Sequence, residues 1–237
     1  MIARSKAWFR RLLALGPLAL FNLGVLLFAA WVFVAIADEV EEEEYLHLET
    51  QFMRLLREAE TGEPFGDSKM VEIARDITAL GSGAALGTTV ALIVGFLLFS
   101  RRYAAALFLA AASIGGASLN SLLKSLYGRT RPEEQLRLIE IDSLSFPSGH
   151  AMSSATIYLT IAVLLARMAE KPREKIYIFA AALLLSFAVG FSRVYLGVHY
   201  PTDVIAGWAA GVAWAQVCWF VAHLIGRRRL ARTASAA

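Results

Sequence analysis

Six long apolar stretches constrain this chain more than any other feature of its sequence. They cover about residues 12–37, 77–100, 103–124, 148–167, 175–193 and 203–226, and Asp, Glu, Lys or Arg occurs in them only at an end. A helix needs roughly 20 mostly apolar residues to cross the hydrocarbon core of a bilayer. We therefore predict an all-α, polytopic membrane protein in which residues 1–237 form one bundle of six transmembrane helices.

The charges between the stretches predict how the bundle is oriented. Six spans place both termini on one side, together with the basic segments 4–11, 101–102, 167–175 and 227–232. All acidic residues except Glu170 and Glu174 fall on the other side. Because Lys and Arg favour the cytoplasmic side, we expect cytoplasmic termini in the cell membrane (inner or plasma membrane) and outward-facing segments at 38–76, 124–147 and 193–203. The net charge of +3 thus indicates membrane topology, and no nucleic-acid partner is predicted.

The first stretch fits a second interpretation. Basic residues before an apolar run, followed by Ala35 and Ala37 ahead of Asp38, are also typical of a cleaved signal peptide. The apolar run over residues 12–37 is longer than the roughly 7–15 residues usual for such a peptide. We therefore expect the first span to be retained.

An amphipathic pattern follows in the first outward segment. Leu48, Phe52, Leu55 and Leu56 recur at helical spacing, with charges between them, which predicts a helix over residues 45–57. Such a helix could lie on the membrane surface or pack across the mouth of the bundle, and the sequence leaves both interpretations open. In the spans, the pairs Gly83/Gly87 and Gly207/Gly211 predict close helix packing.

Three motifs bring polar residues to the outward ends of the later spans. Residues 124–132 read K-x6-R-P, residues 147–150 read P-S-G-H, and residues 192–203 read S-R-x5-H-x3-D. Any one of these residues has a structural explanation, such as a lysine that reaches the interface or an arginine at a helix C-terminus. Ionisable residues at membrane depth are costly, however, and a whole group on one face indicates a functional site. The candidates are Lys124, Arg131, Ser148, Gly149, His150, Arg193, His199 and Asp203.

The residue types in these motifs favour phosphate as the ligand. Lys124, Arg131 and Arg193 supply more positive charge than a carboxylate needs, and the guanidinium fork matches phosphate oxygens. Ser148 and Gly149 precede a span, where backbone N–H groups at a helix N-terminus bind anions. No carboxylate cluster suits magnesium and no His/Cys spacing suits zinc, so we predict no metal and no cofactor.

Two histidines suit phosphoryl transfer, one as the nucleophile and one as the acid that protonates the leaving oxygen. Asp203 follows His199 by four residues and is placed to accept its second ring N–H, which fixes the tautomer. This spacing predicts that His199 is the nucleophile and His150 the general acid.

The three motifs closely resemble those of the type-2 phosphatidic acid phosphatase superfamily, which includes lipid phosphate phosphatases, glucose-6-phosphatase and vanadium haloperoxidases. The resemblance covers residues 124–203, and every motif position matches in the family order. It implies a metal-independent enzyme in which Lys124, Arg131, Ser148, Gly149 and Arg193 bind phosphate. It also implies that His150 protonates the leaving group, His199 forms a phosphohistidine and Asp203 orients His199.

The resemblance extends to compact bacterial enzymes that act on undecaprenyl pyrophosphate or phosphatidylglycerophosphate, and the motifs do not separate these substrates. It therefore implies a membrane lipid phosphate as the substrate, and the charge distribution predicts hydrolysis on the outer (periplasmic) face. A phosphotransferase that passes the phosphate from His199 to a second lipid is the alternative enzyme. A transporter is the non-enzymatic alternative, but its ionisable residues would lie near mid-span rather than at span ends. The sequence does not indicate an oligomeric state.

Overall fold

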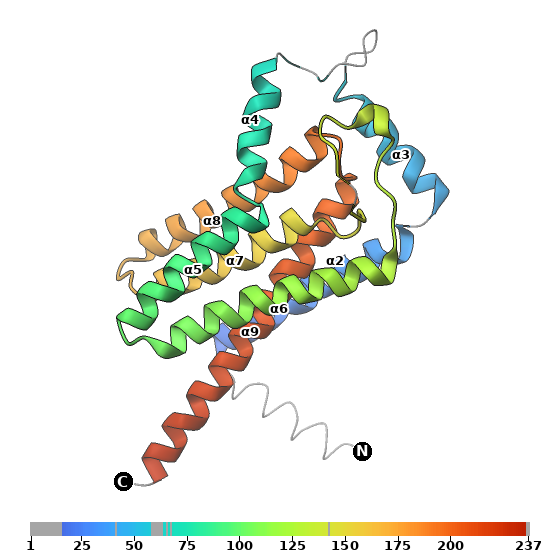
Figure 1. Ribbon diagram of the computed structural model, residues 1–237. Helices are drawn as coiled ribbons and strands as arrows, with labels where there is room; N and C mark the ends of the chain where they lie inside the picture. Colours follow the sequence, from blue (N-terminus) through green and yellow to red (C-terminus); the bar gives the residue numbers. More distant parts are fainter. Residues whose placement is uncertain are drawn as a thin grey trace, which may run out of the picture.

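The computed structural model describes residues 16–40, 42–57, 64, 66, 68–141 and 143–235, and no strand occurs among them. The basic segment 4–11 and the start of the first predicted span lie outside the described residues. The helices (Figure 1) are α2 (Pro17–Glu39), α3 (Glu43–Arg54), α4 (Ser68–Ala79), α5 (Gly83–Phe99), α6 (Tyr103–Tyr127), α7 (Gly149–Ala166), α8 (Pro172–Tyr195) and α9 (Pro201–Ser235), with a short 3₁₀ turn η1 (Glu134–Leu136).

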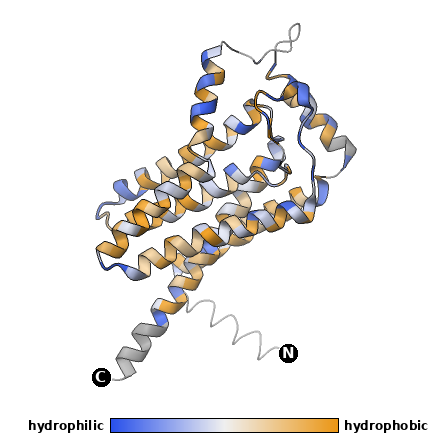
Figure 2. Cartoon of the chain, viewed as in Figure 1, coloured by the Kyte–Doolittle hydropathy of each residue, from blue (hydrophilic) through white to orange (hydrophobic). Residues whose placement is uncertain are grey.

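The chain is an all-helical membrane protein by the length and composition of these helices. Five are long and apolar enough to cross a bilayer: α2, α6, α7, α8 and residues Pro201–Arg227 of α9. The consecutive helices α4 and α5 pass the same test as a pair, which gives up to six spans. Figure 2 shows apolar residues along the bundle and hydrophilic residues on α3, on the outer part of α4 and in the connecting loops.

The second predicted span, residues 77–100, is interrupted in the structure. Helix α4 ends at Ala79, α5 begins at Gly83, and the two are bent by 41°. Ser82 caps α5, since its hydroxyl accepts a hydrogen bond from the backbone N–H of Ala85 at 3.2 Å. Gly81 lies so close to Val189 of α8 that a Cβ there would overlap the valine side chain. The break therefore lets α4 lie against α8 while α5 turns to pack against α6 and α7.

Helix α7 lies at the centre of the bundle and packs against α6, α8 and α9 (Figure 1). Its buried positions are mostly small, which permits close approach of neighbouring helices: Ala151, Met152, Ser154, Ala155, Thr156, Ile157, Thr160 and Ala162. Helix α9 comes closest at Gly207, where a Cβ would lie 2.7 Å from the Ser148 carbonyl oxygen, and at Gly211, where it would meet the Met152 carbonyl oxygen. By contrast, nothing lies within 4 Å of a Cβ placed at Gly83 or Gly87, so the close packing predicted for that pair is wrong.

Three aromatic rings anchor the loop between α6 and α7. The Phe146 ring is fully buried and lies 5.0 Å from the Tyr127 ring of α6 and 5.8 Å from the Phe33 ring of α2, measured between centroids. Such contacts add to the stability gained from apolar burial alone. They fix the segment that leads directly into Ser148 and α7.

Helix α3 packs across one end of the bundle while keeping an apolar stripe exposed. Met53 is 1% exposed and packs with Leu136, Tyr200 and Val204. Leu48 and Phe52, which belong to the predicted apolar face, are 55% and 47% exposed. One side of α3 therefore covers the bundle, and the other side offers apolar surface suited to the membrane interface.

Candidate functional site

The end of the bundle beneath α3 brings the sequence-predicted polar residues together. Lys124 lies in the last turn of α6, Arg193 in the last turn of α8, His150 in the first turn of α7 and Asp203 in the first turn of α9. Figure 1 shows that these helix ends lie at the same end of the bundle, opposite the C-terminal end of α9. Arg131 and His199 lie in the loops that join α6 to α7 and α8 to α9.

His199 is held between a carboxylate and a guanidinium. It is 1% exposed. Its Nδ1 lies 3.3 Å from Oδ2 of Asp203 and 3.3 Å from the Ser145 hydroxyl. Its Nε2 lies 3.2 Å from a terminal nitrogen of Arg131. Because Arg131 can only donate and the carboxylate can only accept, this arrangement favours the tautomer with the proton on Nδ1 and a lone pair on Nε2.

Burial lowers the pKa of His199 to about 4. The hydrogen bond and negative charge of Asp203 oppose this shift, and the nearby charges of Arg131 and Arg193 add to it. Burial also lowers the pKa of Arg131, to about 10, although Asp203 counteracts the effect. At neutral pH His199 is therefore a neutral imidazole beside a charged guanidinium.

Hydrogen bonds hold the three predicted cations in place. Arg131 donates to the Ser143 carbonyl at 2.6 Å and also to the Val198 carbonyl, next to His199. Lys124 donates to the Leu144 carbonyl in the same loop. Arg193 is 2% exposed and donates to the Thr78 hydroxyl of α4 at 3.0 Å. The cations therefore join helix ends that are distant in sequence.

His150 is half-buried, and its ring faces Gly81 in the break between α4 and α5, where a Cβ would lie 3.3 Å from its Cδ2. Its electrostatic neighbours are Arg193, His199, Arg131 and Lys124. The general acid predicted from the sequence is thus within electrostatic reach of the predicted cations and of the predicted nucleophile.

The start of α7 presents buried polar atoms to this group. The Ser148 backbone N–H donates to the Asp203 carbonyl at 2.9 Å, which joins the second motif to the third. The Ser148 hydroxyl and the Arg193 Nε are buried and have no hydrogen-bond partner among the described residues. Unsatisfied buried groups are rare in native proteins and call for an explanation. Gly149 leaves room for Asn120 of α6, whose amide nitrogen would lie 3.1 Å from a Cβ at this position.

Three further residues complete the site and were not predicted from the sequence. Arg129 donates to Asp203 at 2.7 Å and to Glu49 of α3 at 2.6 Å. The Ser145 hydroxyl donates to Asp203. In the sequence G-R-T-R-P, a second arginine, Arg129, lies two residues before Arg131. This position close to a motif residue is the feature of the sequence that could have indicated Arg129. Glu49 lies in the acidic outer segment and carried no such signal.

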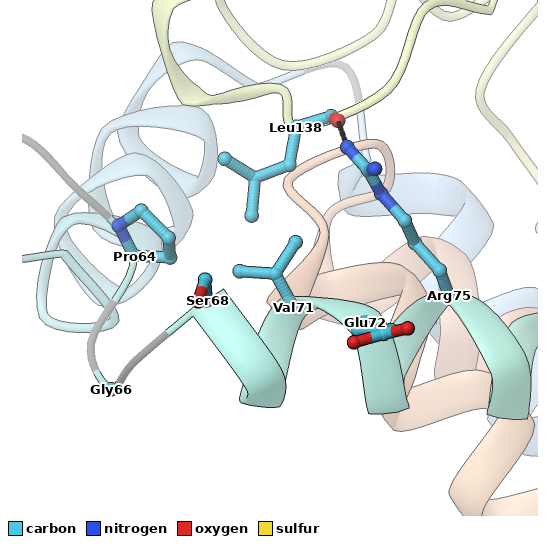
Figure 3. A pocket seen from close by; sticks show the side chains of 7 residues that line it. All are labelled: Pro64, Gly66, Ser68, Val71, Glu72, Arg75 and Leu138. Atoms are coloured by element: carbon cyan, nitrogen blue, oxygen red, sulfur yellow. Dashed lines mark hydrogen bonds between the residues drawn. The ribbon is translucent and has the colours of Figure 1, made fainter.

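Other features of the structure lie apart from this group. Within the described ranges, no three His, Cys, Asp or Glu side chains are grouped so as to hold a metal ion. A cavity of about 570 Å³ opens beside α4, lined by Pro64, Gly66, Ser68, Val71, Glu72, Arg75 and Leu138 (Figure 3). Arg75 closes one side of it by donating to the Leu138 carbonyl at 2.8 Å. None of the eight predicted site residues lines this cavity.

The fold and the site together define a helical membrane protein with a cationic, histidine-containing centre at one end of its bundle. Residues 103–227 match the PAP2 superfamily, and the chain belongs to this superfamily. It is 35% identical to phosphatidylglycerophosphatase B of Bacillus subtilis over 60% of this chain and 70% of that protein. It is 31% identical to decaprenylphosphoryl-5-phosphoribose phosphatase of Mycobacterium tuberculosis over 69% of this chain and 85% of that protein.

A solved structure shows a similar fold. The crystal structure of a transmembrane PAP2-type phosphatidylglycerolphosphate phosphatase from Bacillus subtilis superposes with a TM-score of 0.71 at 26% identity, covering 84% of this chain and 94% of that one. LpxE of Aquifex aeolicus gives a TM-score of 0.55 at 26% identity, covering 74% and 94%. This chain is therefore a lipid phosphatase with the fold of its family.

Proposed function

We propose that the protein hydrolyses a membrane lipid phosphate or pyrophosphate without a metal ion, through a phosphohistidine on His199. The observation that carries this proposal is the orientation of the His199 ring. Asp203 and Ser145 engage Nδ1, while Nε2 faces Arg131. A neutral imidazole whose Nε2 carries a lone pair rather than a proton, beside a cation that attracts phosphate, is the arrangement that a nucleophile for phosphorus requires.

The phosphate would bind among Lys124, Arg131 and Arg193 at the start of α7. The unsatisfied Ser148 hydroxyl and Arg193 Nε are donors that phosphate oxygens would satisfy. The N-terminal end of α7 adds backbone N–H groups and a partial positive charge. In a buried site these fixed charges stabilise the transition state more strongly than they would in water.

In the first step the Nε2 lone pair of His199 attacks phosphorus while the bond from phosphorus to the leaving oxygen breaks. His150 gives its proton to that oxygen. His199 becomes an N-phosphorylated cation whose Nδ1–H stays bonded to Asp203. In the second step the neutral His150 accepts a proton from water, the water oxygen bonds to phosphorus, and the bond between phosphorus and nitrogen breaks. Inorganic phosphate leaves, and both histidines return to their starting states.

Direct detection of the intermediate tests this mechanism. The purified protein in detergent, quenched during turnover of a ³²P-labelled lipid phosphate, should carry an alkali-stable, acid-labile label. His199→Ala should remove the label and lower kcat by about 10³-fold or more. His47→Ala is the matched control, because His47 is an exposed histidine of α3, and it should keep both activity and label. Wild-type activity in His199→Ala would refute the assigned nucleophile.

The substrate class that we propose is a lipid with a terminal phosphate, with undecaprenyl pyrophosphate or phosphatidylglycerophosphate as first choices. The names of the relatives support a lipid with a glycerol or polyprenyl phosphate head. A panel with undecaprenyl pyrophosphate, phosphatidylglycerophosphate, phosphatidic acid, a lipid A phosphate and decaprenylphosphoryl-5-phosphoribose would rank kcat/KM. Release of free phosphate supports hydrolysis. Its absence, together with a newly phosphorylated second lipid, would indicate transfer instead.

We also propose that the site faces the outside of the cell membrane. The support is the distribution of charge, because the basic segments lie at the opposite end of the spans from the site motifs. Alkaline phosphatase fused after residue 237 should be inactive, and a fluorescent protein fused there should fluoresce. The reverse result would place the site on the cytoplasmic side.

A further inference from the structure

A buried chain of charges links α3 to the predicted nucleophile. One terminal nitrogen of Arg129 lies 2.6 Å from the Glu49 carboxylate, and the other lies 2.7 Å from the Asp203 carboxylate. The side chains of Arg129, Glu49 and Asp203 are 5%, 8% and 0% exposed. In such surroundings ion pairs are screened little by solvent or salt. The charge on each member of this chain therefore affects the others strongly.

Arg129 is fixed in place by contacts other than its two ion pairs. Its guanidinium carbon lies 4.2 Å from the centre of the Tyr200 ring, in a cation–π contact. It also donates to the Thr202 hydroxyl at 3.0 Å. Its backbone carbonyl accepts a hydrogen bond from the Ser145 N–H at 2.9 Å, and Ser145 in turn donates to Asp203. Arg129 thus acts on Asp203 through both its side chain and its backbone.

Glu49 completes the link from the side of α3. Its second carboxylate oxygen accepts from the Thr202 backbone N–H at 2.9 Å and from the Thr202 hydroxyl at 2.7 Å. Both contacts lie in the first turn of α9, directly before Asp203. A helix that covers the mouth of the bundle is therefore bonded to the same turn that carries the predicted orienting carboxylate.

We propose that Arg129 is a positioning residue, an inference that rests on the proposed role of His199. Its guanidinium pairs with both Glu49 and Asp203, so it partly neutralises the carboxylate that faces His199. The same pairs tie α3 to the reacting centre. The two terminal nitrogens of Arg129 are engaged by carboxylates, and its Nε is buried without a hydrogen-bond partner among the described residues. Burial alone would lower the pKa of Arg129, but Asp203 and Glu49 more than offset this and raise it. The Arg129 guanidinium is therefore charged at neutral pH.

The charge balance gives a test that simple loss of structure would not mimic. Removing the positive charge in Arg129→Met leaves the Asp203 charge unshared, so protonated His199 is stabilised and His199 titrates at a higher pH than in the wild type. In Glu49→Gln the carboxylate that competes with Asp203 for Arg129 has lost its charge. The Arg129 cation then acts on Asp203 alone, so His199 titrates at the wild-type pH or below. Disruption would admit water in both variants and raise both values. The other charged or titratable groups around His199 are Asp203, Arg131, Arg193 and His150, and neither variant changes them.

The measurement is the titration of His199 by NMR of ¹⁵N-histidine-labelled protein in detergent, with kcat and KM on a short-chain lipid phosphate. Arg129→Met should lower kcat by about 10–100-fold with little change in KM, and Arg129→Lys should restore part of it by restoring the charge. Arg54→Met is the matched control, because Arg54 of α3 pairs with Glu133 at the exposed surface. It should leave the kinetics and the titration as in the wild type.

Two outcomes would overturn the inference. One is a His199 titration that does not move in Arg129→Met, or that rises equally in Glu49→Gln. The other is a loss in Arg129→Met that lies wholly in KM, which would make Arg129 a phosphate ligand. If Arg129→Met does not fold, Arg129→Gln, which removes the same charge but keeps hydrogen-bonding groups, takes its place in the comparison with Glu49→Gln. Because the NMR titration needs no turnover, a failure of this coupling is distinguishable from a failure of the phosphohistidine mechanism.

Discussion

Nδ1 of His199 lies 3.3 Å from Oδ2 of Asp203, and the same carboxylate oxygen accepts the Tyr200 backbone N–H at 2.9 Å. From the first turn of α9, the Asp203 carboxylate thus fixes both the backbone at Tyr200, just before the helix, and the imidazole of His199. The arrangement keeps the proton on Nδ1 and directs Nε2 toward Arg131. It also places a negative charge where His199 becomes cationic on attack at phosphorus.

Asp203→Asn should therefore inactivate the enzyme while leaving its overall shape intact. An amide can donate to Nδ1, which favours the wrong tautomer, and it carries no charge to balance the phosphorylated imidazole. We expect kcat to fall by about 10³–10⁴-fold, as in other catalytic triads, with a smaller change in KM. Steady-state kinetics on a lipid phosphate measure this. Asp76→Asn, at an exposed position of α4, is the control. A kcat near that of the wild type in Asp203→Asn would remove the carboxylate from the mechanism.

The lowered pKa of His199 predicts how the protein responds to acid. An unfolded histidine titrates near 6.5, whereas His199 in the folded protein titrates near 4 because it is buried. Between these values the unfolded chain binds a proton that the folded protein does not, so the free energy of unfolding falls as the pH drops from about 6.5 to about 4. Above 6.5 this contribution to stability is complete.

Two measurements check this expectation. NMR of labelled histidines should show one ring, absent from the spectrum of His199→Asn, that stays neutral at pH 6. The midpoint of thermal unfolding in detergent should fall less between pH 7 and pH 5 in His199→Asn than in the wild type. A His199 ring that titrates near 6.5 would mean that water reaches the site freely.

The sequence was sufficient to predict an all-helical membrane protein, because spanning a bilayer requires long apolar stretches whatever the tertiary packing. It did not predict the break at Gly81 within residues 77–100, since the break depends on how closely Val189 of α8 approaches. Nor did it predict that Gly83 and Gly87 would differ from Gly207 and Gly211, because a glycine pair in a sequence does not reveal which helix lies opposite it.

The contacts within the site were also predicted only in part from the sequence. Motif spacing identified His199 and Asp203 as partners, since residues four apart near a helix start lie close together. Glu49 is one of the charges between the apolar positions of the helix predicted over residues 45–57, yet it is buried against Arg129, 80 residues further along the chain. A contact of that sequence separation leaves no periodic signal. Charge pairing across the mouth of the bundle is visible only in three dimensions.

The position of His150 at the start of α7 predicts a dependence on the leaving group. A lipid alkoxide is a poor leaving group and needs a proton, whereas p-nitrophenolate needs little help. We therefore expect His150→Asn to lower kcat/KM for a lipid phosphate by about 10²–10⁴-fold, and for p-nitrophenyl phosphate by much less. Parallel assays of the two substrates with the same protein preparation measure the difference. Equal losses on both substrates would indicate that His150 binds phosphate rather than donating a proton.

Gly197 lies two residues before His199 and should tolerate no side chain. Its φ is +76°, a conformation that other residues adopt only at a cost of about 1–2 kcal/mol. A Cβ there would also overlap the Leu136 carbonyl and crowd the Arg57 guanidinium, at 2.8 Å. Arg57 itself is fixed by hydrogen bonds to the Leu136 and Tyr195 carbonyls, at 2.6 and 3.1 Å.

Gly197→Ala should therefore displace the turn that carries His199, lowering both the midpoint of thermal unfolding in detergent and kcat. Gly95→Ala is the matched control, because a Cβ at Gly95 of α5 would meet nothing within 4 Å and alanine favours helix. That control should unfold at the wild-type midpoint or slightly above it and keep full activity. If Gly197→Ala behaved like Gly95→Ala, the turn would be more compliant than its contacts imply, and the position of His199 would not depend on it.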